Sequence, residues 1–130
     1  MSVTNTLTAN LSVSISGTGK AISGQVGSYA GAQEVQEAIV VPASTTNQHV
    51  VISFPFATLQ LLLIKSSQDI TIKVNSSTTP TETFTVKKTA ALMYGTDFAV
   101  ANPLAHDVTD LYITNAGTTD AAVDLFALHN

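Results

Sequence analysis

Apolar and polar residues alternate along much of this chain, and this alternation constrains the fold more than any other feature. Leu7, Ala9, Leu11, Val13 and Ile15 are separated by single polar residues. A period of two is that of a β-strand, so all five are predicted to lie on one face of a sheet. Helical periodicity is limited to residues 32–38 (AQEVQEA), where we expect at most one helical turn. The chain is therefore predicted to be all-β.

Turn residues divide the chain into roughly eight or nine short expected strands. Residues 20–33 are rich in glycine, which predicts either a weak strand with bulges or a loop. The later strands are expected at 34–41, 49–54, 58–65, 69–75, 82–87, 90–94, 110–115 and 121–128. Short strands separated by turns are typical of an antiparallel β-sandwich or barrel. We expect a single sandwich domain over residues 11–130, with residues 1–10 as a possible N-terminal arm.

The run Leu61, Leu62, Leu63 and Ile64 breaks the alternation, because consecutive apolar residues fill both faces of a strand. The next strand, Ile70 to Val74, has one apolar face only. A strand that is apolar on both faces needs the core on one side and a cover on the other. The cover is expected to be a loop or another subunit. Leu61, Leu62, Leu63 and Ile64 are therefore candidate residues of an oligomer interface.

Charged residues are scarce and mostly acidic. The net charge is −4, and 11% of residues are charged, against about 25% in an average soluble domain. Nucleic acid is not an expected partner, because phosphate binding requires clustered Lys and Arg. Depletion of charge also characterises the buried centre of protein interfaces, so the composition favours assembly with other proteins. A solvated, Thr-rich β protein is the alternative.

No apolar run approaches the roughly 20 residues that cross a bilayer, so we expect no membrane partner. The chain has no cysteine, which excludes disulfides and thiolate metal sites. Residues 16–21 (SGTGKA) are similar to the end of a phosphate-binding loop, but Ala21 replaces the required hydroxyl residue. We therefore expect a hairpin turn there and no bound nucleotide.

Histidine and carboxylate spacings match no local metal motif. His49, His106 and His129, with Asp107, would have to converge in space to bind zinc. The aspartates of the last third, Asp97, Asp107, Asp110, Asp120 and Asp124, are expected to cap solvated turns rather than to hold calcium. No serine lies in a nucleophile-elbow motif. We expect no enzyme activity, no metal and no cofactor.

The second half of the chain carries an order of elements with a known parallel. The segments are DITIKVNSSTTPTETFTVKK (69–88), ALMYG (91–95), DVTDLYITNAG (107–117) and AAVDLFAL (121–128). From Leu61 to Leu128 the chain resembles small virion proteins of tailed bacteriophages that decorate, or cement, the capsid. This resemblance implies a jelly-roll-like β-sandwich, often a homotrimer, on the capsid exterior. Such a protein is made in the host cytoplasm and binds where major capsid protein subunits meet.

Proteins of that kind commonly dock through a flexible terminal arm. The resemblance therefore makes Val3, Thr4, Asn5 and Leu7 candidate capsid contacts, through addition of a strand to a capsid edge. A carbohydrate- or receptor-binding module of a tail fibre or secreted protein is the first alternative, and it predicts an exposed groove near Tyr29 or Tyr94. The third tyrosine, Tyr112, is expected to lie in the core, because its strand is apolar. A small metal-dependent enzyme that uses His49, His106 and the acidic loops is the second alternative.

Overall fold

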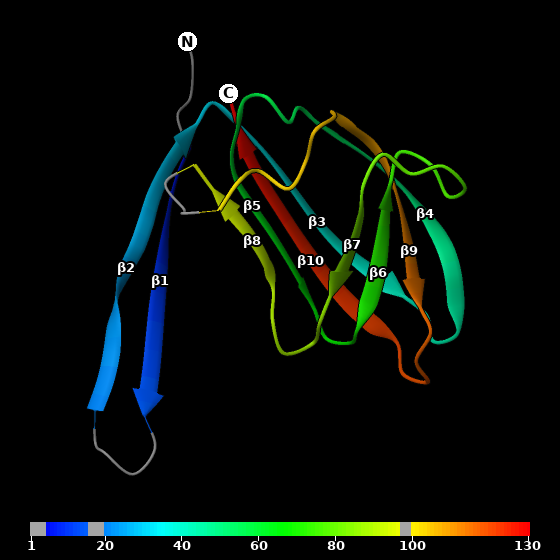
Figure 1. Ribbon diagram of the computed structural model, residues 1–130, viewed down its shortest axis with the longest axis horizontal. Coiled ribbons are helices and arrows are strands. Elements are labelled where there is room, and N and C mark those ends of the chain that lie inside the picture. Colours follow the sequence, from blue (N-terminus) through cyan, green and yellow to red (C-terminus); the bar gives the residue numbers. More distant parts are fainter. Residues whose placement is uncertain (1–4, 16–19, 97–99) are drawn as a thin grey trace.

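The computed structural model describes residues 5–15, 20–96 and 100–130, with side chains from residue 30 onward, and its regular elements there are all β-strands (Figure 1). They are β1 (Asn5–Ile15), β2 (Lys20–Gly31), β3 (Gln33–Val41), β4 (Thr45–Phe54), β5 (Leu59–Ser66), β6 (Ile70–Val74), β7 (Thr83–Val86), β8 (Leu92–Gly95), β9 (Val108–Asn115) and β10 (Ala121–His129). The predicted all-β class is confirmed. Residues 33–38 belong to β3 and not to a helical turn, because Val35, Ile39 and Val41 share the phase that packs on the core.

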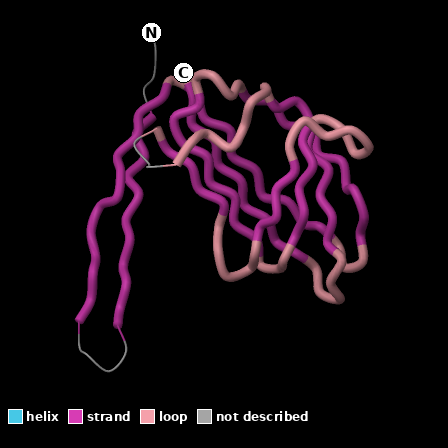
Figure 2. The backbone as a smooth tube through the Cα atoms, viewed as in Figure 1, coloured by secondary structure: helices cyan, strands magenta, loops and turns pink. Residues whose placement is uncertain are grey.

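Two four-stranded antiparallel sheets form a sandwich (Figure 2). The first sheet has the order β3-β10-β5-β8 and the second has the order β4-β9-β6-β7. The pairs are nested along the chain: β6 pairs with β7, β5 with β8, β4 with β9 and β3 with β10. A long hairpin rolled across two sheets in this way is a jelly roll. The expected jelly-roll-like antiparallel sandwich is therefore confirmed.

A separate two-stranded sheet, the β1–β2 hairpin, precedes the sandwich. Its base places Asn5 opposite Gly31, and a β-bulge interrupts the register after Ala9. Residues 20–31 thus form the bulged strand that was one of the two expectations. The hairpin ends at Gly31, so the region outside the sandwich is longer than the expected arm of residues 1–10. The described residues do not include Val3, Thr4 or Asp97. They also leave out most of the turn expected within residues 16–21.

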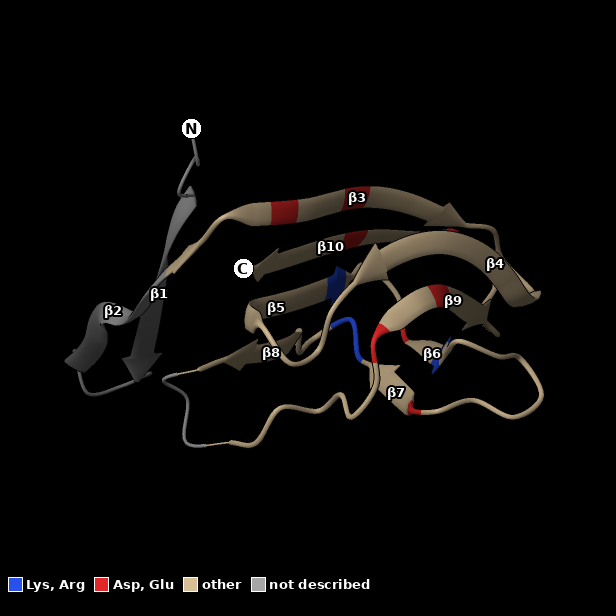
Figure 3. Cartoon of the chain, turned by 90° about the horizontal axis from the view of Figure 1, so that it is seen from above, with Lys and Arg blue, Asp and Glu red and all other residues tan. Residues whose placement is uncertain are grey.

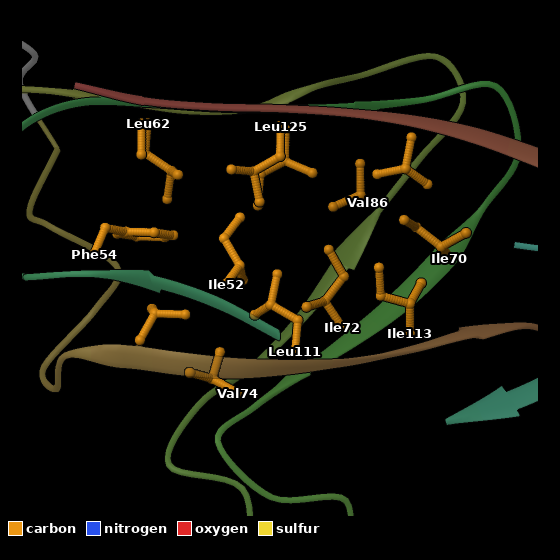
Figure 4. Packing of buried hydrophobic residues seen from close by; sticks show 14 of the residues in the cluster. Ile52, Phe54, Leu62, Ile70, Ile72, Val74, Val86, Leu111, Ile113 and Leu125 are labelled. Atoms are coloured by element: carbon orange, nitrogen blue, oxygen red, sulfur yellow. The ribbon is translucent and has the colours of Figure 1, made fainter. Parts of the chain in front are cut away.

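Inward-facing residues of both sheets meet in one core (Figure 4). Leu62 and Leu125 of the first sheet face Ile52, Ile72 and Ile113 of the second. In β6 the burial alternates residue by residue, as its sequence predicts. Each fully buried Leu, Ile or Val contributes roughly 1.5 to 3 kcal/mol, so the core is the main source of stability in this cysteine-free chain.

Strand β5 resolves the solid apolar run into two faces. Leu62 and Ile64 point into the core and are 1% and 3% exposed. Leu61 lies on the outer face, opposite Leu128, yet it is also buried within this single chain. Of the four residues in this run, only Leu63 is partly exposed. Because Leu61, Leu62 and Ile64 are buried within the single chain, they offer almost no surface to another subunit. The predicted oligomer interface stays a prediction for Leu63 alone.

Candidate interaction surface

The outer face of the first sheet carries apolar residues in line across neighbouring strands. Phe126 of β10 lies opposite Leu63 of β5, and Leu63 lies opposite Met93 of β8. Phe126 and Leu63 are half-buried, and Met93 is 41% exposed. We call these three residues the apolar row. A shallow groove beside it is lined by Gln36, Glu37, Ala38, Leu63, Asp124, Leu125 and Phe126.

The neighbouring row on the same face is already covered. Leu61 and Leu128 lie opposite each other and are 2% and 1% exposed, although neither belongs to the core cluster. Gly31, the last residue of β2, lies directly over Leu128: a Cβ placed on Gly31 would come within 2.8 Å of Leu128 Cγ and of the carbonyl oxygen of His129. The absence of a side chain at Gly31 thus allows the hairpin base to sit closely on β10.

Charges are scattered singly over the described strands of the sandwich (Figure 3). On the outer face of the first sheet, Asp124 lies opposite Lys65, beyond the apolar row. Glu34 and Gln36 lie on the edge strand β3. An apolar centre bordered by a few polar groups is the usual anatomy of a protein interface.

The outer face of the second sheet is mostly polar, although it includes the exposed Val51. His49 of β4 and Tyr112 of β9 are cross-strand partners whose rings stack at 4.7 Å between centroids and 6° between planes. The His49 Nε2 atom lies 2.6 Å from Asp110 Oδ1. This hydrogen bond, with one from the Thr109 hydroxyl, holds the pKa of Asp110 below its ordinary 3.8. Tyr112 is a half-buried residue of this outer face, and its expected place in the core is wrong because Leu111 and Ile113 occupy the inward phase.

A second carboxylate, Glu82, is the centre of a hydrogen-bonded cluster between the residues just before β7 and the loop before β9. Glu82 Oε1 accepts hydrogen bonds from the Ala105 backbone N–H and from His106 Nδ1, both at 2.9 Å, and Thr81 donates to the other carboxylate oxygen. Burial by itself raises the pKa of Glu82, but the bonds from Thr81, His106 and Ala105 outweigh it, so the pKa lies below the ordinary 4.5. The cluster fastens the β6–β7 connection to the loop before β9.

The three histidines occupy different elements with different partners. His49 is in the second sheet, His106 is in the loop before β9, and His129 is buried at the end of β10 in the first sheet. Within residues 5–15, 20–96 and 100–130, no three His, Asp or Glu side chains gather as metal ligands would. Asp107 instead accepts the backbone N–H of Phe56 at 3.1 Å.

Other candidate residues are placed as follows. Tyr94 packs against the core, while the side chain of Tyr29 is among those not described. Asn5 and Leu7 lie in β1, where they pair with Gly31 and Tyr29. None of the described segments is a helix with the length and apolar character needed to cross a membrane. Comparison with known proteins finds no matching family model, curated protein or solved structure.

Sequence reasoning missed Phe126 and Met93 as surface residues. The signal for Phe126 was present: in AAVDLFAL it shares the phase of Ala122 and Asp124, opposite to that of Val123 and Leu125. For Met93 the phase follows from the register of the short edge strand β8 on β5, which the sequence does not specify.

Proposed function

We propose that this protein is a non-enzymatic structural virion protein that decorates the exterior of a tailed-bacteriophage capsid and stabilises it by binding between major capsid protein subunits. The observation that carries the proposal is the combination of a jelly roll with a hairpin that extends beyond it. Jelly rolls recur in viral capsid proteins. Since one fold serves many functions, the proposal rests equally on the resemblance over Leu61 to Leu128.

The hairpin supplies a means of attachment. In a two-stranded sheet each strand is paired on one side, and the other edge of β1 has no partner among the described strands. An open edge of this kind binds a further strand through main-chain hydrogen bonds. We place Val3, Thr4, Asn5 and Leu7 in this capsid contact. A homotrimer would present three such edges, and the effective concentration of the second and third would strengthen weak single contacts.

Binding to capsids tests the proposal. Purified protein is mixed with expanded capsids that lack decoration, and bound protein is measured after sedimentation. We expect saturable binding to expanded capsids and weaker binding to unexpanded shells. Val3→Asp should reduce the binding, because it adds a charge to the proposed contact, whereas Val51→Asp should not, because Val51 lies 76% exposed on β4. Absence of saturable binding would reject the proposal.

The alternative is a carbohydrate- or receptor-binding module of a tail fibre or secreted protein. The half-buried Tyr112, with the acidic Asp110 on the same outer face, favours a site on the second sheet over one at Tyr94. A glycan array probed with the wild-type protein and with Tyr112→Ala distinguishes this function. Glycan binding that disappears in the variant, together with no capsid binding, would establish the alternative.

A further inference from the structure

We propose that the apolar row on the outer face of the first sheet, Leu63, Met93 and Phe126, binds the β1–β2 hairpin of a second copy of this chain. The inference deepens the self-association that accompanies the proposed function, but it requires no capsid. Its evidence comes from three features: the isolation of the hairpin, the exposure of the row, and the contact already made at Gly31.

The hairpin lacks a supporting layer along most of its length. It forms its own two-stranded sheet and extends away from the sandwich (Figure 1). A two-stranded hairpin alone is marginally stable in water, so it requires another surface for burial. The sequence of β1 has the apolar phase Leu7, Ala9, Leu11, Val13 and Ile15, which gives such a strand one apolar face.

The hairpin of the same chain covers only part of the outer face. At its base, the close approach of Gly31 to the His129 carbonyl oxygen and to Leu128 seats the hairpin over the row of Leu61 and Leu128. Beyond this base the hairpin diverges from β5 and β10 towards its tip (Figure 1). The next row, with Leu63 and Phe126, is left uncovered by the described residues and retains partial exposure.

A second copy fits the uncovered row better than a charged partner does. Between Asn5 and Gly31 the only charged residue is Lys20, so burial of the apolar face of the hairpin requires the desolvation of no carboxylate and of at most one ammonium group. The apolar row is continuous with the covered row, where the same kind of contact, β2 on the first sheet, exists within one chain. Exchange of hairpins between copies repeats this contact in a self-complementary assembly.

Solution mass gives the first test. We expect the full-length chain to form an oligomer by light scattering, and Phe126→Lys or Met93→Lys to raise its dissociation constant about tenfold or more. Met93 lies on the edge strand β8 and is 41% exposed, so Met93→Lys retains the fold if Phe126→Lys does not. Val51→Lys is the matched control, because Val51 is a more exposed apolar residue in the other sheet.

Cross-linking identifies the contact, and the absence of native cysteine simplifies it. Val13→Cys and Met93→Cys chains are purified separately, mixed, and treated with a short bis-maleimide. We expect linked heterodimers from this pair and none from Val13→Cys with Val51→Cys. A double variant carries Val13→Cys and Met93→Cys in one chain. It should link between chains at concentrations where the oligomer forms. After dilution to the monomer, it should not link within one chain.

The results separate this inference from the capsid proposal. A monomer at high micromolar concentration, an oligomer unaffected by both lysine variants, or cross-links confined to single chains would each overturn the exchange of hairpins. A chain that exchanges hairpins but shows no saturable capsid binding would instead overturn the proposed function and leave this inference standing.

Discussion

At the scale of single residues, Asn115 shows how a polar side chain stabilises an apolar sandwich. It is completely buried at the end of β9. Its Nδ2 donates to the carbonyl oxygens of Val41 at 3.1 Å and Thr119 at 2.8 Å, and its Oδ1 accepts the Gly117 N–H at 3.1 Å. The amide thereby joins the end of β3 to the turn between β9 and β10.

Replacing Asn115 should destabilise the fold, because the backbone groups that its amide binds would lose their partner. We expect Asn115→Leu, which conserves size, to lower the free energy of unfolding by about 2 kcal/mol or more, because buried groups lose their hydrogen-bond partners. The exposed Thr118→Ala, in the same turn, is the control and should change it by less than about 0.5 kcal/mol. Urea denaturation measures both, and equal effects would contradict the role of the amide.

Glu82 predicts the response of stability to acid. Its pKa is lowered in the folded protein, so the fold favours the ionised carboxylate. The stabilisation is therefore present above the ordinary pKa of 4.5 and is lost as the pH falls through the lowered value. We expect Glu82→Gln to flatten the decline of unfolding free energy as the pH falls below the ordinary pKa of 4.5. Glu37→Gln, on the exposed edge strand β3, serves as the control, and identical profiles for both variants would contradict the assignment.

Some residue positions could be predicted from the sequence and others could not. Leu111 and Ile113 point into the core, so Tyr112 between them points outward. The alternation of side chains along a strand predicts this, but the apolar composition of the strand led to the expectation that Tyr112 is core. The contact of Glu82 with His106 depends on how two loops fold against each other. No short-range pattern encodes it.

At the scale of elements, β5 is a central strand whose successive leucines have different environments. Leu62 points into the core, whereas Leu63 lies in the apolar row. We expect Leu62→Ala to lower the free energy of unfolding by about 2 to 5 kcal/mol, because it leaves a cavity. Leu63→Ala should cost less than about 1 kcal/mol in the monomer, since its site is already partly hydrated. Similar losses in urea denaturation would contradict the two-faced strand.

The junction between the hairpin and the sandwich depends on Gly31. We expect Gly31→Val to displace the base of the hairpin, because the added Cβ would meet the His129 carbonyl oxygen at 2.8 Å. Limited proteolysis should then cut within residues 5–31 faster, while the sandwich stays resistant. Ala32→Val, at the exposed neighbouring position, should leave the cleavage rate unchanged. Uniformly faster cleavage of the whole chain would indicate general unfolding instead.

The sequence predicted strands more readily than their assignment to sheets. Alternation and turn residues locate all the sandwich strands to within a few residues, because period two is a local property. The separation of β1 and β2 from the sandwich is not local, since a glycine-rich strand fits a sheet edge or an isolated hairpin equally well. The contact of Gly31 with β10 fixes the hairpin at the edge of the sandwich. This contact exists only when β10 is in place, so it is not encoded by the local sequence.

At the scale of the whole molecule, the nested strand pairs arrange contacts by sequence distance. The innermost pair, β6 with β7, joins neighbouring strands, whereas β3 with β10 joins strands from opposite ends of the sandwich. Closing a longer loop costs more chain entropy before any contact rewards it. The inner pair should therefore be structured earlier in folding than the outer pair.

Two matched substitutions test this order. Val86 in β7 and Val123 in β10 are both 1% exposed, so Val→Ala should destabilise each to a similar degree. We expect Val86→Ala mainly to slow folding, because its pairing with Ile70 forms before the transition state. Val123→Ala should mainly accelerate unfolding, because its pairing with Ile39 forms late. Stopped-flow folding and unfolding rates separate the two effects, and the reverse assignment would show that the outer strands of the jelly roll nucleate folding.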